Sequence, residues 1–432
     1  MNRIYRLPIA LSVIILIVLS GWADPSAARQ LDGVSERPSE LEILYTYYGI
    51  ALDQNPELAS LKREAEAMSE RSRQVKVLPD PQIRTSYFLN PVNDADFLDR
   101  FSVGISQAFP WFGTLSKRSQ IEDDRSRALL YGVSARQLEI FTEIQDLWFQ
   151  YFTLEHHAHI TGGILQLIRD LEPIIEARYQ TAGSSQVDLL RLQMEEQRLM
   201  ERMEAFEDNK KPIQARFNEL LNRDFDAEIV VPMDLPQREL AFTREELLRM
   251  ALDYHPGFDR LEAQKSEFRH RMDLARLEGR PSFVLGFDVQ GRQHGMLNLM
   301  MERNEILTTT ATIRVPLFRS RYNAQRQEAQ LQLQRVQLQE EGLTNTMQTR
   351  IEQSYIDLID AQRKHRLITE ELVPRMEHAF ALITEEYRNG TARFDEVLQI
   401  SRELLMLEME RVEKLTAQNS AMAALEQITA TD

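Results

Sequence analysis

The chain has 432 residues and a net charge of −16 at pH 7, which disfavours a general nucleic-acid-binding protein, because such proteins need a basic surface to neutralise phosphates. The absence of cysteine excludes disulfide bonds, thiolate metal sites, a cysteine nucleophile and a lipid-modified N-terminal cysteine. Glycine and proline are scarce, at 16 each, whereas Glu, Gln, Arg, Leu and Ala are abundant, as in chains dominated by long helices.

Residues 1–28 are typical of a secretory signal peptide. Arg3 and Arg6 precede a short apolar run, and small residues then offer cleavage sites after Ala23 or Ala28. The apolar run is shorter than the roughly 20 residues of a membrane-spanning helix, which disfavours the alternative of an N-terminal anchor. We therefore predict an exported protein with a flexible lead over residues 29–39 and no later transmembrane helix.

Residues 40–221 form a predicted first structural repeat. It begins with two short helices, about 40–53 and 56–78, separated at Asn55-Pro56, since proline suits the first turn of a helix. Apolar and polar residues then alternate in "PQIRTSYF" and in "FSVGISQAF". This alternation predicts a pair of strands, a β-hairpin over about 82–109.

A long helical hairpin completes this repeat. Its first helix is predicted from about 114 to 182, Gly183 breaks the chain, and a second helix returns over about 185–221. Apolar residues recur at 3-4 spacing along both helices, which is typical of coiled-coil packing. These stripes contain Ile140, Ile144, Leu147, Tyr151 and Leu154 on the first helix and Leu189, Leu192, Leu199, Met203 and Phe206 on the second.

The second half of the chain repeats this order of elements. A proline-rich connector over 222–241 leads to a second structural repeat over 242–428, and residues 429–432 form a C-terminal tail. Thr243 and Glu246 have the spacing of a capping box at the start of the first helix. The later elements expected are a second helix after His255-Pro256, a β-hairpin over about 282–317, a long helix over about 319–389, a break at Gly390 and a last helix to about 428.

Matching landmarks indicate that the two halves arose by duplication. "ALDQNP" at 51–56 corresponds to "ALDYHP" at 251–256, and the further landmarks follow at offsets of 200 to 207 residues. The matched positions are Pro56 and Pro256, Pro81 and Pro281, Pro110 and Pro316, and Gly183 and Gly390. A chance hexapeptide match would not bring the whole order of elements with it.

The dimensions of the predicted elements favour a tube that meets a membrane. Helices of about 70 residues would extend on the order of 100 Å at 1.5 Å per residue, which no globular core requires. Strands of about 9–11 residues suit a bilayer-crossing β-strand. Four strands cannot close a barrel, and open sheet edges are excluded from lipid, so the chain must oligomerise if its strands enter a membrane; three copies supply twelve strands. The four strand–helix junctions carry prolines that stop the sheet ladder and set a bend, namely Pro81, Pro110, Pro281 and Pro316.

The mature chain from about 40 to 428 resembles the TolC-type outer membrane factors, which are exit ducts of tripartite efflux pumps and type I secretion systems. The resemblance rests on the duplication and on "LPDPQI", "VGISQAFPWFG", "ATIRVPLF" and "YRNGTARFDEVLQ". "LPDPQI" and "SQAFPWFG" further resemble the heavy-metal branch of that family. The resemblance implies a mainly α fold with a small β part, in which duplicated helical hairpins and four strands build a trimeric twelve-stranded barrel in the outer membrane.

The same resemblance implies the setting in which the protein works. It implies a homotrimer in the outer membrane of a Gram-negative bacterium, in contact with lipid, with a helical tunnel that extends into the periplasm. The expected partners are a periplasmic adaptor and an inner-membrane pump of the resistance–nodulation–division type. The expected cargo is metal ions or small toxic molecules, and no cofactor is implied.

The family closes its periplasmic end near the two glycine breaks, where acidic residues surround the pore. The matching stretches here are "YQTAGSSQVDLL" and "YRNGTARFDEVL". The gate and selectivity candidates are Tyr179, Asp188, Tyr387, Arg393, Asp395 and Glu396. Three copies of one carboxylate around a narrow axis repel one another, and Arg or Tyr links between helices could hold the mouth shut. The alternative is that these residues are ordinary solvated charges at helix ends.

Other chemistry is weakly represented in the sequence. His156 and His159 in "EHHAH" could share one helix face, but strong metal motifs need more ligands, so we expect solvated side chains there. The alternation places Arg84, Asp288 and Arg314 on the polar faces of the strands. We identify neither a phosphate-binding loop nor a convincing nucleophile–base pair, and therefore expect a non-enzyme. The main alternative to a channel is a periplasmic coiled-coil adaptor or scaffold without a pore.

Overall fold

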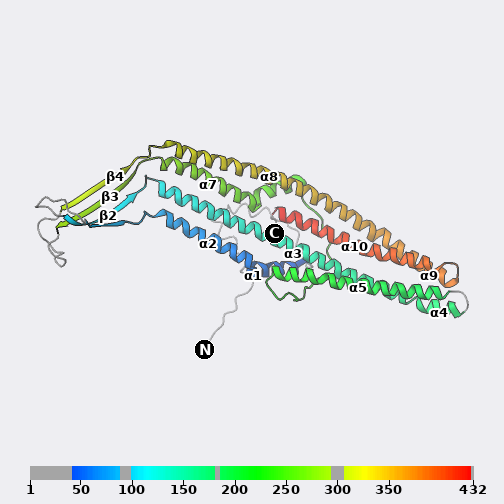
Figure 1. Ribbon diagram of the computed structural model, residues 1–432. Coiled ribbons are helices and arrows are strands. Elements are labelled where there is room, and N and C mark those ends of the chain that lie inside the picture. The colour runs from blue at the N-terminus through cyan, green and yellow to red at the C-terminus, as the bar shows by residue number, and fades with distance from the viewer. Residues whose placement is uncertain (1–40, 88–98, 181–184, 293–305, 430–432) are drawn as a thin grey trace, which may run out of the picture.

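The computed structural model describes residues 41–87, 99–180, 185–292 and 306–429. The predicted signal peptide and lead, Gly183 and residues 430–432 of the predicted tail lie outside these ranges. Figure 1 shows an elongated molecule with a small sheet at one end and long helices that run away from it. The expected fold class, mainly helical with a small β part, is confirmed.

Four antiparallel strands form one sheet in the order β1-β2-β3-β4. They are β1 (Gln82–Tyr87), β2 (Asp99–Phe109), β3 (Ser282–Arg292) and β4 (Ile306–Arg314). The two predicted hairpins join along β2 and β3, where Ile105 lies opposite Phe287 and Ser106 lies opposite Gly286. The outer edges of the sheet therefore belong to β1 and β4, one from each repeat.

The period-2 pattern of the strands gives the sheet one apolar and one polar face. On the apolar face, Ile83 is 74% exposed and Leu307 is 70% exposed. On the polar face, Arg84, Gly104 and Asp288 share one cross-strand row. The carboxylate of Asp288 occupies the space that a Cβ on Gly104 would fill, so a larger residue there would displace the Asp288 side chain. A large apolar surface that faces outward is a feature of interaction sites rather than of an isolated soluble sheet.

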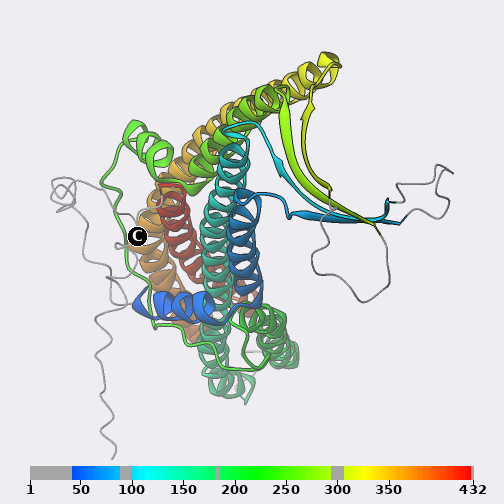
Figure 2. The same ribbon diagram turned by 90° about the vertical axis from the view of Figure 1, so that its left-hand side faces the viewer.

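Each strand continues into, or follows, one helix of a side-by-side layer (Figure 2). The helices pack in the order α2 (Pro56–Lys76), α3 (Thr114–Arg169), α7 (Pro256–Glu278) and α8 (Arg319–Leu367). The four predicted junction prolines lie between these helices and the strands: Pro81 and Pro281 directly before β1 and β3, Pro110 directly after β2, and Pro316 between β4 and α8. Proline has no backbone N–H for the sheet ladder, so each junction ends the ladder where a helix takes over.

The layer narrows to two helical hairpins at the end far from the sheet. In the first repeat α3 leads to α4 (Glu172–Gln180) and α5 (Gln186–Leu220). In the second repeat α8 continues through a π-helix (Ile368–Leu372) into α9 (Val373–Asn389), and α10 (Phe394–Thr429) returns. The left-handed Gly390, with φ of 84°, ends α9 as expected for a glycine cap.

The predicted single helix over 114–182 is wrong in one respect. α3 ends at Arg169, and a turn at Asp170 and Leu171 separates it from α4. The physical reason is Pro173, which cannot donate a backbone hydrogen bond and whose ring clashes with the preceding turn. The matching helix of the second repeat runs without a turn from Arg319 to Asn389 but needs a π-helical segment to do so.

The main hydrophobic core lies at mid-length, where α3 contacts α1 (Glu42–Gln54), α5 and α10. Trp148 and Phe152 of α3 and Phe217 of α5 are fully buried in it. The connector crosses this region, and the indole N–H of Trp148 donates to the carbonyl of Val230 at 3.0 Å.

The predicted coiled-coil stripe therefore describes only part of the buried surface of α3. Leu147, Tyr151 and Leu154 are partly buried, whereas Trp148 and Phe152 are fully buried. A coiled-coil stripe describes one helix face, whereas α3 packs against several elements.

The two helix–proline joints differ in their contacts. At the first joint Asn55 caps α2 by accepting from the N–H of Leu58 at 3.0 Å, and its amide donates to the carbonyl of Leu220 at 2.9 Å. At the second joint, between α6 (Arg244–Tyr254) and α7, the ring of His255 accepts from the N–H of Gly257 at 3.1 Å. Of the two side chains, only that of Asn55 also bonds the end of α5, the returning helix of its repeat.

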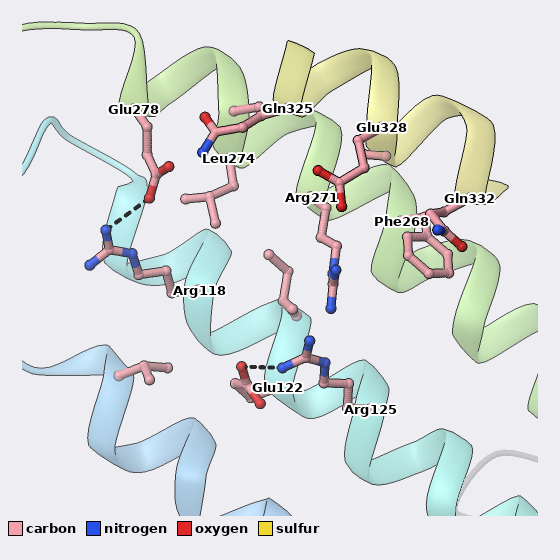
Figure 3. A pocket seen from close by; sticks show the side chains of 14 residues that line it. Arg118, Glu122, Arg125, Phe268, Arg271, Leu274, Glu278, Gln325, Glu328 and Gln332 are labelled. Atoms are coloured by element: carbon pink, nitrogen blue, oxygen red, sulfur yellow. Dashed lines mark hydrogen bonds and ion pairs between the residues drawn. The ribbon is translucent and has the colours of Figure 1, made fainter. Parts of the chain in front are cut away.

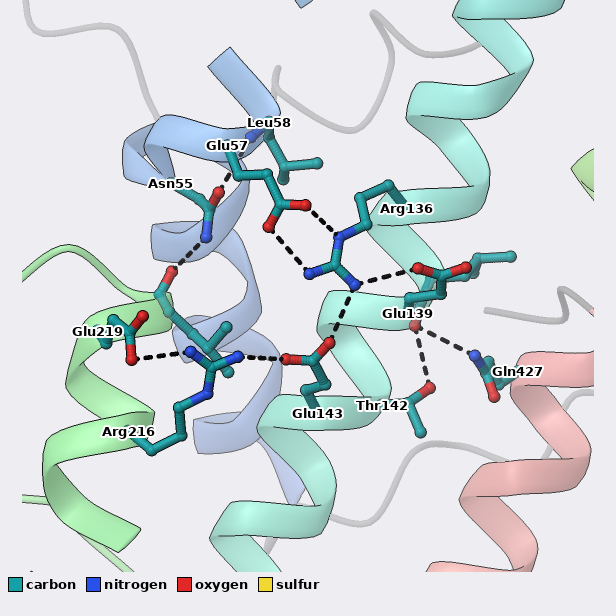
Figure 4. A network of polar contacts seen from close by, with 12 residues as sticks. Asn55, Glu57, Leu58, Arg136, Glu139, Thr142, Glu143, Arg216, Glu219 and Gln427 are labelled. Atoms are coloured by element: carbon teal, nitrogen blue, oxygen red, sulfur yellow. Dashed lines mark hydrogen bonds and ion pairs between the residues drawn. The ribbon is translucent and has the colours of Figure 1, made fainter. Parts of the chain in front are cut away.

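Ion pairs surround the first joint (Figure 4). Arg136 of α3 donates to the two carboxylate oxygens of Glu57 at 2.8 and 2.9 Å and to Glu143 at 2.9 Å. Glu143 in turn accepts from Arg216 of α5 at 3.1 Å. The hydrogen bond from Arg136 holds the pKa of the Glu57 carboxyl below its usual range. The network connects α2, α3 and α5 at the level where the core begins.

Candidate functional site

The predicted gate residues lie at the tips of the two hairpins, at the opposite end of the molecule from the sheet (Figure 1). Tyr179 is on α4, Asp188 is in the first turn of α5, and Tyr387 is in the last turn of α9. Arg393 directly precedes α10, and Asp395 and Glu396 are in its first turn. Acidic residues in the first turn of a helix are favoured by the helix dipole, so a local structural reason for them exists alongside any role in a pore.

Tyr387 is the central residue of the tip contacts. It is only 1% exposed, and its ring lies 5.5 Å from the ring of Phe394. The guanidinium of Arg178 lies 4.4 Å from the ring centroid and donates to the carbonyl oxygen of Tyr387. The phenol donates to the carboxylate of Asp188 at 3.5 Å. Tyr387 at the end of α9 thus contacts α4, α5 and the first residue of α10.

The acidic residues of α10 are held by two different partners. Asp395 forms an ion pair with Arg191 of α5, which links the two returning helices. Glu396 accepts a hydrogen bond from the backbone N–H of Arg393 at 3.0 Å, and its carboxylate lies 3.7 Å from the guanidinium of Arg393. Glu396 therefore caps the start of α10 while its side chain stays partly exposed.

A further ion pair links α5 and α10 at a level farther from the tip than Asp395. Glu195 of α5 has a side chain that is only 6% exposed, and it accepts from Arg402 of α10, with one contact at 2.9 Å. The hydrogen bond from Arg402 lowers the pKa of the Glu195 carboxyl. A buried carboxylate of this kind is stable only while it remains paired, so the contact sets the relative position of the returning helices.

The structure brings four of the predicted residues together in two pairs and gives a fifth a partner that the sequence analysis missed. Asp188 meets Tyr387, and Arg393 meets Glu396, whereas Asp395 pairs with Arg191, which was not predicted. Tyr179 is 56% exposed and takes part in none of these contacts.

The missed partners are Arg178, Arg191, Glu195 and Arg402. One signal could have identified the last two, because Glu195 and Arg402 are 207 residues apart, the same offset that relates Gly183 and Gly390. Opposite charges at equivalent positions of two repeats predict an ion pair across the pseudo-symmetry.

A cavity of about 330 Å³ lies near the sheet, between the strand-proximal turns of α3, α7 and α8 (Figure 3). Arg118 donates to Glu278 at 2.9 Å, and Arg125 donates to Glu122 and Glu267 at 2.8 Å each. Burial raises the pKa of the Glu267 carboxyl. The pairs Arg118–Glu278 and Arg125–Glu267 connect α3 to α7, so these charges serve the packing of the layer.

The histidines of "EHHAH" have structural roles or lie in solvent. The ring nitrogens Nδ1 and Nε2 of His156 lie 2.9 Å from the carbonyl oxygen of Phe152 and 3.0 Å from that of Met233, and the nitrogen that carries the proton donates to its carbonyl. His156 therefore fixes the connector against α3, rather than being simply solvated as expected, and His159 is exposed.

Comparisons with known proteins identify the fold. No protein-family model and no curated protein sequence matches the chain. Among solved structures, the outer-membrane channel OprN superposes with a TM-score of 0.76 at 15% identity, over 90% of each chain. The outer membrane protein VceC of Vibrio cholerae gives 0.75 at 16% identity, over 89% of this chain and 95% of that chain. CusC, a protein that forms a transmembrane channel, gives 0.69 at 15% identity, over 90% of this chain and 92% of that chain.

The chain shares the fold of these outer-membrane channels. The likeness covers both the sheet and the helical hairpins, because it extends over about nine-tenths of the chain. Within the described ranges, no helix is both long and apolar enough to cross a membrane.

Proposed function

We propose that the protein is the outer-membrane exit duct of a tripartite efflux system and belongs with the TolC-like outer membrane factors. In this proposal three copies join their sheets into a twelve-stranded barrel, and the helices form a tunnel through the periplasm. The observation that carries the proposal is the four-stranded sheet with an exposed apolar face and open edges on β1 and β4. Such a sheet suits a bilayer only when neighbouring copies pair its edges.

The tips of the helical hairpins have features of a tunnel entrance that opens and closes. The tip carries Asp188, Asp395 and Glu396, and threefold symmetry would repeat each carboxylate around the axis. The links of Tyr387 and Arg191 to these carboxylates are the kind that holds a mouth closed. We propose that a periplasmic adaptor releases the closed mouth and that an inner-membrane pump of the resistance–nodulation–division type supplies the cargo, metal ions or small toxic molecules.

The decisive experiment combines cell fractionation with planar-bilayer recording of the purified protein. We expect the protein in the outer-membrane fraction, as a trimer that inserts into bilayers and conducts ions. A soluble, non-conducting monomer in the periplasmic fraction would exclude the duct and favour a coiled-coil scaffold. Heat-treated protein is the control for conductance that arises from contaminating porins or detergent.

A further inference from the structure

The junctions after β2 and β4 carry matching pairs of apolar residues. The pairs are Trp111-Phe112 and Leu317-Phe318, which lie 206 residues apart, within the offsets of the duplication. Phe112 is 82% exposed and Phe318 is 83% exposed. A single apolar side chain in water needs no explanation, but contiguous ones of this size at equivalent places of two repeats indicate a surface that meets a partner.

The first of these pairs continues the apolar face of the sheet. Phe109, Phe283 and Ile313 form the last cross-strand row of that face before the helices. The ring of Trp111 stacks on Phe283 with centroids 6.2 Å apart, and the ring of Phe112 lies 6.0 Å from that of Trp111. The apolar surface therefore extends past the end of the ladder and finishes at a tryptophan, a residue type that prefers the boundary between hydrocarbon and headgroups.

Basic side chains lie at the same level of the molecule. Figure 1 shows the strand–helix junctions at one level along the long axis. Three of the four junctions carry exposed cations that form no ion pair within the part of the chain that the structure describes. This set, the basic collar, consists of Lys76 before β1, Arg280 before β3, and Arg319 and Arg321 after β4. At the fourth junction, Lys117 and Arg118 are paired with carboxylates of α7.

The charge at this level is opposite in sign to that of the whole chain. The protein has a net charge of −16, yet the four junction segments together hold four basic residues and one acidic residue, Asp80. These segments are 76–81, 110–113, 279–281 and 315–321. Exposed cations beside an apolar surface suit an anionic phospholipid, because the apolar side chains reach the acyl chains while the cations meet the phosphate groups.

We propose that the basic collar and the two apolar pairs form a belt that binds anionic phospholipids of the phosphatidylglycerol class, in the leaflet that faces the helices. The apolar pairs occupy the edge of the hydrocarbon layer, and the collar donates hydrogen bonds to phosphate oxygens. This belt sets how deeply the sheet lies in the bilayer. The inference rests on the proposed function in one respect, because it takes the sheet to lie in the outer membrane.

Trp111 is a natural reporter for this contact. Of the three tryptophans, Trp22 lies in the predicted signal peptide, and Trp148 is fully buried and roughly 50 Å along α3 from Trp111. Bromine atoms on a lipid chain quench the fluorescence of tryptophan only at close range. Brominated phosphatidylglycerol or brominated phosphatidylcholine is therefore titrated into the purified protein in neutral detergent at low salt.

We expect phosphatidylglycerol to quench at a mole fraction at least about tenfold lower than phosphatidylcholine. Each cation near an anionic lipid surface contributes on the order of fivefold to binding, and salt screens this contribution. Trp111→Phe should abolish the quenching by both lipids. Equal quenching by the two lipids, or undiminished quenching in Trp111→Phe, would overturn the proposal.

Two matched variants assign the preference to the collar. The collar variant combines Lys76→Gln, Arg280→Gln, Arg319→Gln and Arg321→Gln. The control variant combines Lys62→Gln, Arg335→Gln, Arg350→Gln and Arg366→Gln, which remove exposed cations of α2 and α8 that lie roughly 20 Å or more from the junctions. We expect the collar variant to be quenched equally by both lipids and the control variant to keep the preference. A preference that survives in the collar variant would refute the belt.

Two further measurements distinguish other partners of the same cations. Inorganic phosphate should reduce quenching by phosphatidylglycerol no more than chloride does at the same ionic strength. A larger reduction would assign the collar to a soluble anion and overturn the proposal. Size-exclusion chromatography in lipid-free detergent should give the same oligomer for both variants. Dissociation of the collar variant alone would show that the cations hold neighbouring copies together, and the belt would fail.

The result is separable from conduction. If the protein prefers phosphatidylglycerol at Trp111 but never conducts in planar bilayers, the proposed duct fails and the lipid belt stands. If it conducts but is quenched equally by both lipids, the duct stands and the lipid belt fails.

Discussion

At the residue scale, the tip is held by charges and dipoles that come from opposite repeats. Arg178, Arg191 and Arg402 each reach a group on the other repeat's hairpin. Hydrogen bonds to ionised partners contribute about 1.5–3 kcal/mol each, more than the bonds between neutral groups. Because the partners of these arginines come from distant sequence positions, the sequence predicted the acidic residues of the tip but missed most of the cations that hold them.

Two replacements of Glu396 distinguish its role as a helix cap from the role of its negative charge. Glu396→Ala removes both, whereas Glu396→Gln keeps an acceptor for the N–H of Arg393 and removes only the charge. In planar bilayers we expect block by multivalent cations to weaken in both variants, because the proposed trimer would lose three carboxylates from its mouth. Only the alanine variant should also lose about 1 kcal/mol of stability, the usual contribution of a helix cap, by thermal denaturation. Undiminished block in the glutamine variant would remove Glu396 from the gate.

At the element scale, periodicity predicted most of the helices and strands, because long helices and strands reveal their period over many residues. α1 and α2 were expected over 40–53 and 56–78, and the structure has them at Glu42–Gln54 and Pro56–Lys76. The turn at Asp170 and Leu171 was missed, since the apolar pattern continues through it. The periodicity of apolar residues indicates which face of a helix is buried. It does not show whether the helix ends or bends at a proline.

The first helix–proline joint offers a test of element packing. Asn55→Ala removes both the cap on α2 and the tether to Leu220, whereas Asn55→Asp keeps an acceptor for the cap and loses the donor. We expect a loss of about 2 kcal/mol for alanine and a smaller loss for aspartate, by chemical denaturation. His255→Ala is the control from the second repeat, where only the cap contact to Gly257 is lost. Equal losses for Asn55→Ala and Asn55→Asp would show that the tether, not the cap, is the important contact.

At the scale of the whole molecule, the sequence predicted the duplication and the four strands, and the structure adds how the repeats meet. The two hairpins pair along β2 and β3, and α3 packs against α7 in the same order. The period-2 pattern could not establish this pairing, because alternation assigns faces but not neighbours. The open edges at β1 and β4 follow directly from it.

Cross-linking can detect the pairing of these edges between copies. Thr85→Cys on β1 is combined in turn with cysteine at Leu307, Thr309 or Ala311 on β4, all on the same face of the sheet. We expect at least one combination to give covalent dimers and trimers on a non-reducing gel after mild oxidation, and Thr85→Cys alone to stay monomeric. If no combination links copies while the protein sediments as a trimer, the copies associate through other surfaces.

The side-by-side order of α2, α3, α7 and α8 affects the folding stability of the chain. α8 lies at one end of the layer, and Leu331, Leu338 and Ile359 on it are exposed. No described element of the chain covers these side chains, and in the proposed trimer a neighbouring copy would cover them. If the copies associate as proposed, mass action makes the ratio of native to unfolded chains depend on the protein concentration. If the proposed trimer forms, the stability of each chain is therefore a property of the population of chains and not of one polypeptide.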